Sequence, residues 1–200
     1  MKRGRLVAFE GIDGCGKSTQ LARAAEALRR SGHDVVETRE PTDGPTGQRI
    51  RDMARSDEPV TPREELRWFV EDRREHVTQV IEPALAAGQL VLTDRYTLSS
   101  AAYQGARGLE HLAILEQGER DFPVPDLVLL FEIDPAAALR RVEHRGATAE
   151  PVFERLDFLA YAAALFATLE RPYIERIDAE ADPDTVHERV MEALARRAIP

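Results

Sequence analysis

The sequence predicts an α/β fold in which a mainly parallel sheet carries helices on both faces. Short, nearly continuous apolar runs alternate with longer segments whose apolar residues recur every three or four positions. Such alternation is typical of buried parallel strands joined by right-handed helical crossovers. A glycine-rich phosphate-binding motif also stands between the first predicted strand and the first predicted helix, as its mechanism requires.

In the first half of the chain, each predicted element is bounded by turn residues or helix-breaking residues. An apolar run predicts the first strand at 5–10, and a helical apolar period predicts a helix over 17–30. A second strand is expected at 34–38. Prolines and glycines then indicate an irregular loop before a helix around 48–55. A threonine followed by proline begins a long helical stretch, which we expect to cover 61–88 and to end at a glycine.

The second half continues the same alternation. Apolar runs predict strands at 90–93, 127–133 and 173–177. Asp134, followed directly by proline, has the signature of a helix N-terminus after the middle one of these strands. The same signature and a four-residue apolar period predict a closing helix over 182–197. Because ligands of such sheets bind beyond the carboxyl ends of the strands, the polar residues that follow the strands locate the expected site.

The size and charge of the chain favour a single domain, 1–200, with small-molecule partners. The 200 residues are 43% hydrophobic and 32% charged, which is enough for one sizeable core. The net charge of -9 offers no broad basic surface for a polyanion, so we expect no nucleic acid partner. No run approaches the roughly 18 apolar residues of a membrane span, so we expect no membrane partner.

The cysteine and histidine content argues against a disulfide and a metal cage. Cys15 is the only cysteine, so no intrachain disulfide can form, and we expect a reducing, cytoplasmic location. The histidines show no spacing typical of metal ligands, and we expect all of them to be solvent-exposed helix residues. They are His33, His76, His111, His144 and His187.

Residues 11–18, GIDGCGKS, match the P-loop pattern that binds the phosphates of a nucleotide. In such a loop, the backbone N–H groups and the helix N-terminus face the phosphates, the lysine reaches the β and γ oxygens, and the serine ligates Mg2+. Asp94, at the end of a predicted strand, is a second candidate for the metal site. The predicted donor-binding residues are Gly11, Ile12, Asp13, Gly14, Cys15, Gly16, Lys17, Ser18 and Thr19. A thiol pKa tends to fall beside a helix N-terminus, although a small residue that fits a tight loop is the simpler interpretation of Cys15.

The P-loop alone does not identify an acceptor, because GTPase switches, ATPases and kinases all use it. Phe69 and Arg73 are one helical turn apart, so they share a helix face on which a ring can stack on a base and a guanidinium can bond a base carbonyl. Arg95 places a cation beside Asp94, where it suits the phosphate of an acceptor. Further polar candidates follow within one short segment: Ser99, Tyr103 and Gln104.

With these residues in place, the chain resembles the thymidylate kinase family almost from end to end. The segments that resemble its signatures, in its order, are 9–20 (FEGIDGCGKSTQ), 38–41 (TREP), 69–77 (FVEDRREHV), 91–105 (VLTDRYTLSSAAYQG), 126–135 (DLVLLFEIDP) and 177–190 (IDAEADPDTVHERV). The combination of the P-loop with the pattern DRYxxSxxAYQG is highly specific.

The resemblance implies a P-loop NTPase fold of the nucleoside monophosphate kinase type, with a five-stranded parallel sheet, helices on both faces and a lid. It implies Mg2+ and ATP as donor, dTMP as acceptor, dTDP and ADP as products, and a homodimer. By the same resemblance, Phe69 stacks on thymine and Arg73 reads the base, while Arg95 and Arg39 hold the acceptor phosphate. Ser99, Tyr103 and Gln104 form the base and sugar pocket, Tyr103 disfavours a ribose 2′-hydroxyl, and Asp13 lies near the sugar 3′-hydroxyl and the metal.

The lid is expected at about 145–155, a segment with small residues and turn signals between arginines. Some thymidylate kinases carry an arginine within the P-loop, whereas this chain has Gly14 and Cys15 there. The missing cation is therefore expected from Arg145 or Arg155, with Arg141 as a further candidate. The family usually has Asp-Arg where this chain has Glu154-Arg155. The predicted catalytic residues are Asp13, Lys17, Arg95, Arg145 and Arg155.

Two alternatives stay open at this stage. The first is a kinase for another pyrimidine nucleotide, which Phe69 and Arg73 disfavour and a panel of acceptors would test. The second is a P-loop nucleotide switch, which would bind ATP without an acceptor and hydrolyse it slowly.

Overall fold

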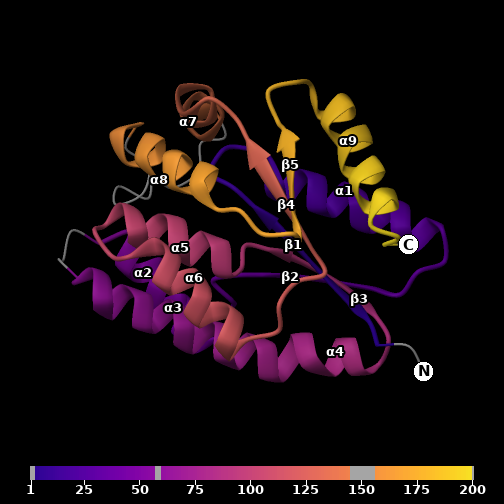
Figure 1. Ribbon diagram of the computed structural model, residues 1–200, viewed down its shortest axis with the longest axis horizontal. Coiled ribbons are helices and arrows are strands. Elements are labelled where there is room, and N and C mark those ends of the chain that lie inside the picture. Colours follow the sequence, from indigo (N-terminus) through magenta and orange to yellow (C-terminus); the bar gives the residue numbers. More distant parts are fainter. Residues whose placement is uncertain (1–2, 57–59, 145–155, 200) are drawn as a thin grey trace.

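The computed structural model describes residues 3–56, 60–144 and 156–199, and its sheet agrees with the prediction. Five parallel strands are arranged in the order β2-β3-β1-β4-β5 (Figure 1). Their bounds are β1 Arg5–Glu10, β2 Val35–Arg39, β3 Leu90–Asp94, β4 Leu127–Glu132 and β5 Ile174–Asp178. The first strand has the predicted bounds, and the others differ from them by one residue at one or both ends.

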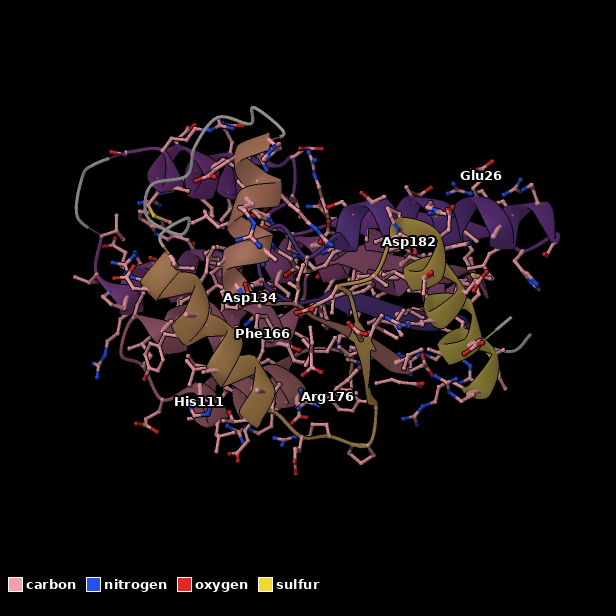
Figure 2. The ribbon with its side chains drawn as sticks, turned by 90° about the horizontal axis from the view of Figure 1, so that it is seen from above. Glu26, His111, Asp134, Phe166, Arg176 and Asp182 are labelled. Carbon is pink, nitrogen blue, oxygen red and sulfur yellow. The ribbon has the colours of Figure 1, made fainter. Side chains whose placement is uncertain are left out.

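Helices cover both faces of this sheet (Figure 1). Their bounds are α1 Lys17–Arg30, α2 Pro45–Ala54, α3 Pro62–His76, α4 Glu82–Ala86, α5 Thr97–Ala106, α6 His111–Asp121, α7 Pro135–His144, α8 Leu156–Thr168 and α9 Pro183–Arg196. Helices α1 and α9 lie side by side on one face, and α3 to α6 lie on the other. In the view from above, the end of α8, which carries Phe166, lies near His111 of α6 (Figure 2). Asp182 lies just before the first turn of α9.

The strand pattern explains the depth of the core. All of β1 except Arg5 and all of β4 except Glu132 is buried, because both strands are interior to the sheet and have helices on both faces. The outer strands β2 and β5 are less covered, and each has one buried residue, Val35 and Ile177 respectively. Strands β1 and β3 are parallel neighbours, so their carboxyl ends lie at the same edge of the sheet. At that edge the P-loop follows β1 and Arg95 follows β3.

The predicted helix over 61–88 is interrupted. Helix α3 is followed by a π-helical turn, Val77–Ile81, and then by the short α4. Pro83 explains the change, because it has no N–H to donate to the preceding turn and its ring crowds the carbonyl four residues earlier. The N-terminus is as predicted: the Thr61 side chain accepts a hydrogen bond from the Glu64 N–H.

Three helices have no counterpart in the prediction, namely α5, α6 and α8. In α5 every residue from Thr97 to Gly105 is buried, so no polar face marks its period.

Among the described residues, no helix is both long and apolar enough to span a membrane.

The expectation that all histidines are exposed is wrong: His144 is exposed, His33, His111 and His187 are partly buried, and His76 is buried. His76 is 2% exposed. Its ring contacts the Thr38 hydroxyl at 2.6 Å and the Glu40 carboxylate at 3.0 Å. The histidine therefore links β2 to α3 inside the protein.

Candidate active site

The P-loop connects β1 to α1, and its glycines adopt backbone angles that other residues rarely reach. Gly14 has φ 84° and Gly16 has φ 98°. A Cβ on Gly14 would lie 2.1 Å from the carbonyl oxygen of Ala138 in α7, so this glycine allows α7 to pack against the loop. A Cβ on Gly16 would meet no atom within 4 Å. The loop is therefore open above Gly16, at the N-terminus of α1, which is where a phosphate fits.

Lys17 lies in this cradle as a buried cation without a carboxylate partner among the described residues. The residue is 5% exposed, and its Nζ donates to the Ile12 carbonyl at 2.9 Å and lies 3.6 Å from the Cys15 Sγ. A buried ammonium is costly unless a negative charge compensates it. The arrangement is therefore completed by an anion such as a phosphate.

Cys15 is a small buried residue whose surroundings disfavour the reactive thiolate form. It is 1% exposed, and burial raises its pKa even though the neighbouring charge of Lys17 acts in the opposite direction. A position near a helix N-terminus tends to lower the pKa of a thiol, but here the effect of burial is larger.

Ser18 and Asp94 lie together, as the predicted metal site requires. The Ser18 hydroxyl donates a short hydrogen bond to Asp94 Oδ2. Asp94 Oδ1 is buried and has no hydrogen-bond partner in the described part of the chain. No group of three or more His, Cys, Asp or Glu side chains among those residues could form a protein-only metal cage. One carboxylate and one hydroxyl fit Mg2+, which usually takes its other ligands from phosphates and water.

Asp13 joins the P-loop to Arg95 and Tyr103. The Arg95 guanidinium forms a short ion pair with Asp13 Oδ1, and the Tyr103 hydroxyl donates to Asp13 Oδ2 at 2.7 Å. Burial alone would raise the pKa of Asp13, but the charges of Arg95 and Lys17 outweigh it and lower that pKa to about 2. Burial raises the pKa of Tyr103 well above its usual value. The aspartate is therefore ionised and the phenol neutral at neutral pH.

Arg95 is held in a left-handed backbone conformation, with φ 73°. Its N–H donates to the Phe9 carbonyl at 3.0 Å, and its own carbonyl accepts from the Thr93 hydroxyl at 2.9 Å. The buried carboxylate of Glu10 accepts from the N–H groups of the next turn, at Tyr96 and Ser99. These bonds keep the backbone in a conformation that is uncommon for a residue with a side chain.

A cavity of about 340 Å³ lies between the P-loop, the loop after β2, α3 and α5. The predicted site residues that line it are Asp13, Ser18, Arg39, Phe69, Arg95, Ser99, Tyr103 and Gln104. The sequence analysis missed a second group of lining residues: Glu40, Pro41, Ile50, Arg51, Ala54 and Ser100. This space is called the acceptor cavity below.

Arg73 lies behind the cavity wall and is not one of the lining residues. It is 2% exposed, forms an ion pair with Glu40 and donates to the Ser100 hydroxyl at 3.0 Å. Burial alone would raise the pKa of Glu40, but the charge of Arg73 and the interactions with His76 together outweigh it, and this pKa is lowered. Phe69 and Arg73 lie on the same side of α3, as predicted. The Arg73 guanidinium, however, contacts Ser100, and it is Ser100 that lines the cavity.

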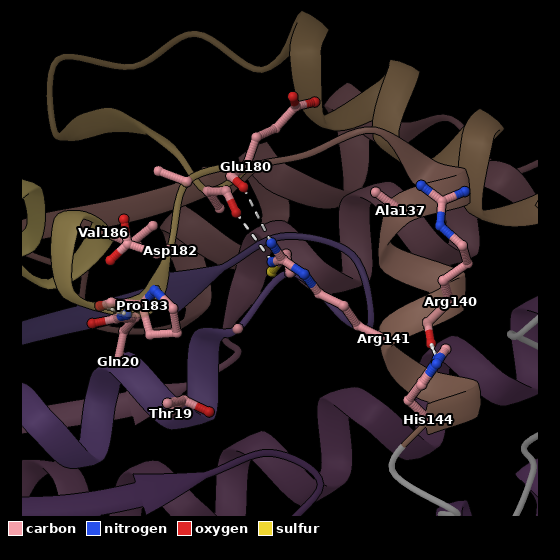
Figure 3. Close-up of a pocket in the computed structure, with 14 residues that line it drawn as sticks. Thr19, Gln20, Ala137, Arg140, Arg141, His144, Glu180, Asp182, Pro183 and Val186 are labelled. Atoms are coloured by element: carbon pink, nitrogen blue, oxygen red, sulfur yellow. Dashed lines mark hydrogen bonds between the residues drawn. The ribbon is translucent and has the colours of Figure 1, made fainter.

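A second cavity, of about 650 Å³, opens between the start of α1, α7 and the connection from β5 to α9 (Figure 3). Arg141 spans it, donating to the carbonyls of Ala179 at 3.1 Å and Glu180 at 3.4 Å. Gln20 donates to the Pro183 carbonyl at 2.8 Å and closes the α1 side. Cys15, Gly16 and Thr19 also line this space, which is called the donor cavity below. The predicted lid, with Arg145 and Arg155, lies outside the described residues.

The P-loop and the first turn of α1, which includes Lys17, border both cavities. A nucleotide switch needs one nucleotide site, whereas a group-transfer enzyme needs a donor and an acceptor site on either side of the phosphates. The fold and the paired cavities therefore define the P-loop nucleoside monophosphate kinase class.

Comparison with known proteins gives the family within this class. The family model described as thymidylate kinase matches residues 9–190, so the chain belongs to the thymidylate kinase family and is a kinase. Relatives named thymidylate kinase come from Desulfotalea psychrophila, with 43% identity over 94% of this chain and 93% of the relative, and from Akkermansia muciniphila, with 43% identity over 98% and 94%. One from Xanthomonas campestris is 44% identical over 97% of this chain and 86% of the relative.

Proposed function

We propose that this kinase transfers the γ-phosphoryl group of ATP to dTMP and releases dTDP and ADP. The observation that carries the proposal is the position of Lys17, a buried cation without a carboxylate partner among the described residues, in a P-loop that borders both cavities. The transfer needs two phosphates held in line with their charge neutralised.

On the donor side, the triphosphate lies along the P-loop N–H groups and the base enters the donor cavity beside Arg141. Lys17 neutralises charge on the β and γ oxygens. Ser18 and Asp94 hold Mg2+, which supplies additional charge neutralisation at the phosphates when bound. Phosphoryl transfer requires little covalent chemistry from the protein, so these residues act by positioning and electrostatics.

On the acceptor side, Arg39, Arg51 and Arg95 provide guanidinium groups for the phosphate of dTMP. Because Asp13 pairs with Arg95, it keeps that guanidinium beside the P-loop. Tyr103 is held by Asp13 and by edge contacts with Phe158 and Phe166, and it fills the space that a ribose 2′-hydroxyl would need.

The base-reading groups lie on the α3 and α5 side of the same cavity. Phe69 offers its ring for stacking. Gln104 is 1% exposed, and its Oε1 is buried without a partner among the described residues. Such an acceptor suits a ring N–H, which thymine and uracil have at N3 and cytosine lacks. These features favour dTMP over the cytidine nucleotide.

Release of ADP from Mg-ATP with different acceptors tests the proposed function. We expect rapid release with dTMP, slower release with dUMP and little with UMP, CMP, AMP or thymidine. Another preferred nucleotide would support the alternative of a different pyrimidine kinase. If dTMP does not raise ADP release above the rate without an acceptor, the proposed function is wrong and a nucleotide switch is favoured.

We also propose that the protein is a homodimer, as the resemblance implies, and that it is cytoplasmic, as its single cysteine indicates. Sedimentation velocity on the purified chain would test the assembly, since a monomer at micromolar concentration would contradict it. Fractionation of the source cells would test the compartment.

Replacement of Phe69 by alanine tests the stacking contact. We expect the KM for dTMP to rise about 10- to 100-fold, because stacking of a base on an aromatic ring contributes about 1–3 kcal/mol. The KM for ATP should stay within about twofold, since Phe69 lines only the acceptor cavity among the two described. A matched rise in both KM values would contradict the assignment. Tyr161→Ala, which removes an exposed ring of α8, serves as a control for loss of an aromatic ring outside the cavity.

A further inference from the structure

The amide of Gln104 is oriented by an ion pair between the buried Glu65 and the partly exposed Arg107. Gln104 Nε2 donates to Glu65 Oε1 at 2.7 Å. The other carboxylate oxygen of Glu65 accepts a short hydrogen bond from Arg107 Nη1. The Glu65 side chain is 0% exposed and does not line the acceptor cavity. Burial raises its pKa, against the bonds from Gln104 and Arg107 that lower it.

This arrangement determines which end of the Gln104 amide is available to a ligand. An ionised carboxylate accepts hydrogen bonds and donates none, so Glu65 binds the NH₂ end of the amide. The oxygen end is then left without a partner among the described residues, on a side chain that lines the cavity. A buried acceptor in that position is satisfied by a ligand that donates.

We infer that Glu65 and Arg107 are positioning residues that set the base specificity of the acceptor cavity through Gln104. The inference rests on the proposed function and deepens it. By fixing the Gln104 oxygen toward the ligand, they select pyrimidines with an N–H at ring position 3, which are thymine and uracil. They act against cytosine, whose ring nitrogen at that position is an acceptor and would face another acceptor.

Arg107 gives the inference a sharp consequence for the variant Glu65→Gln. The guanidinium also donates to the Val60 carbonyl at 2.8 Å, which holds it in place. Because Arg107 only donates, it should bind the oxygen of the new amide at position 65 and turn the NH₂ group toward Gln104. Gln104 must then rotate to accept that bond, and its own NH₂ group faces the cavity. The cavity would change from accepting a ring N–H to donating to a ring nitrogen.

The experiment compares kcat/KM for dTMP, dUMP and dCMP in the wild type and in Glu65→Gln. We expect kcat/KM for dTMP and dUMP to fall together by about 10- to 100-fold, because a buried hydrogen bond is left unmade. We expect dCMP to lose nothing or to gain, so the ratio of dTMP to dCMP falls by a similar or larger factor. The KM for ATP should not change. A ratio equal to that of the wild type would overturn the inference.

Two further variants separate positioning from simple loss of structure. In Glu65→Gln/Gln104→Glu, the new amide can donate to the new carboxylate and still accept from Arg107, so an acceptor again faces the cavity and the preference for dTMP over dCMP should return. Failure of the preference to return would also count against the inference. Glu64→Gln, an exposed neighbour on the same helix, is the matched control and should keep the wild-type ratio.

The comparison remains informative if Glu65→Gln is partly unfolded. A ratio of two kcat/KM values measured on one preparation does not depend on the fraction of active protein. If the single variant yields no folded protein, the double variant decides, since only the proposed orientation predicts that exchanging the two side chains restores both folding and preference. If the wild type does not phosphorylate dTMP, the proposed function fails. If it does and the ratio is unchanged in Glu65→Gln, only the present inference fails.

Discussion

Lys17→Met is expected to lower kcat for dTMP phosphorylation by about 1,000-fold, the largest effect on activity that we predict. Removal of one preorganised donor from a transition state commonly costs a factor of about 100 to 1,000, and here the donor is a full charge. Lys17 is 5% exposed and forms no ion pair with a carboxylate of the described residues. Its electrostatic effect is therefore directed at the phosphates. Stopped-flow or coupled measurement of ADP release at saturating ATP and dTMP would determine kcat.

The fold should tolerate this change. The ammonium donates only to the Ile12 carbonyl and, weakly, to the Cys15 sulfur, and methionine can occupy most of the same volume. We therefore expect the thermal midpoint of Lys17→Met to equal or exceed that of the wild type, since a buried charge is removed. Arg30→Met, an exposed cation at the end of the same helix, is the control and should keep full activity. A kcat within tenfold of wild type would remove Lys17 from the mechanism.

Glu40→Gln is expected to cause the largest loss of stability, about 3 kcal/mol in the free energy of unfolding. The Glu40 and Arg73 side chains are at most 3% exposed, so the substitution leaves the guanidinium buried without its counter-charge. Loss of one partner of a buried ion pair typically costs about 3–5 kcal/mol. Urea unfolding at pH 7 measures the effect. Glu37→Gln, on β2 shortly before Glu40 but in a partly exposed ion pair, should cost less than about 1 kcal/mol.

The difference between wild type and Glu40→Gln should depend on pH. The pKa of Glu40 in the folded protein is lowered from its usual value of 4.5. The stability that it contributes is therefore fully present above pH 4.5 and is lost as the pH falls through the lower folded pKa. The glutamine variant has no such group, so the two unfolding free energies should converge below pH 4.5. A difference that stays constant down to acid pH would indicate that the charge of Glu40 is not responsible.

The parts of this molecule that are encoded locally could be predicted from sequence. The P-loop, the strands and the helices with capping residues carry their signals in a few neighbouring residues. Helix α5 could not be predicted in this way, because its burial on all sides removes the amphipathic period. The π-helical turn after α3 could not be predicted, because the sequence does not show how the helix changes its hydrogen bonds to accommodate Pro83.

The buried partners of the site were the main omission. Glu40, Glu65 and His76 are charged or titratable residues that sequence rules place on the surface, yet each is buried against a group from a distant segment. One signal was available, since Glu65, Phe69, Arg73 and His76 recur at helical spacing on one face of α3. A polar residue in register with predicted site residues is therefore a candidate for orienting them.

The backbone of Arg95 has a consequence for attempts to make this protein more robust. Methods that seek thermostable variants by removing conformational strain would choose glycine at a position with φ 73°, because glycine adopts that angle without a steric penalty. The same replacement would delete the cation that pairs with Asp13 beside the P-loop. Position 95 should therefore be left unchanged in such a search, because a gain in heat resistance there would be accompanied by a lower rate of turnover.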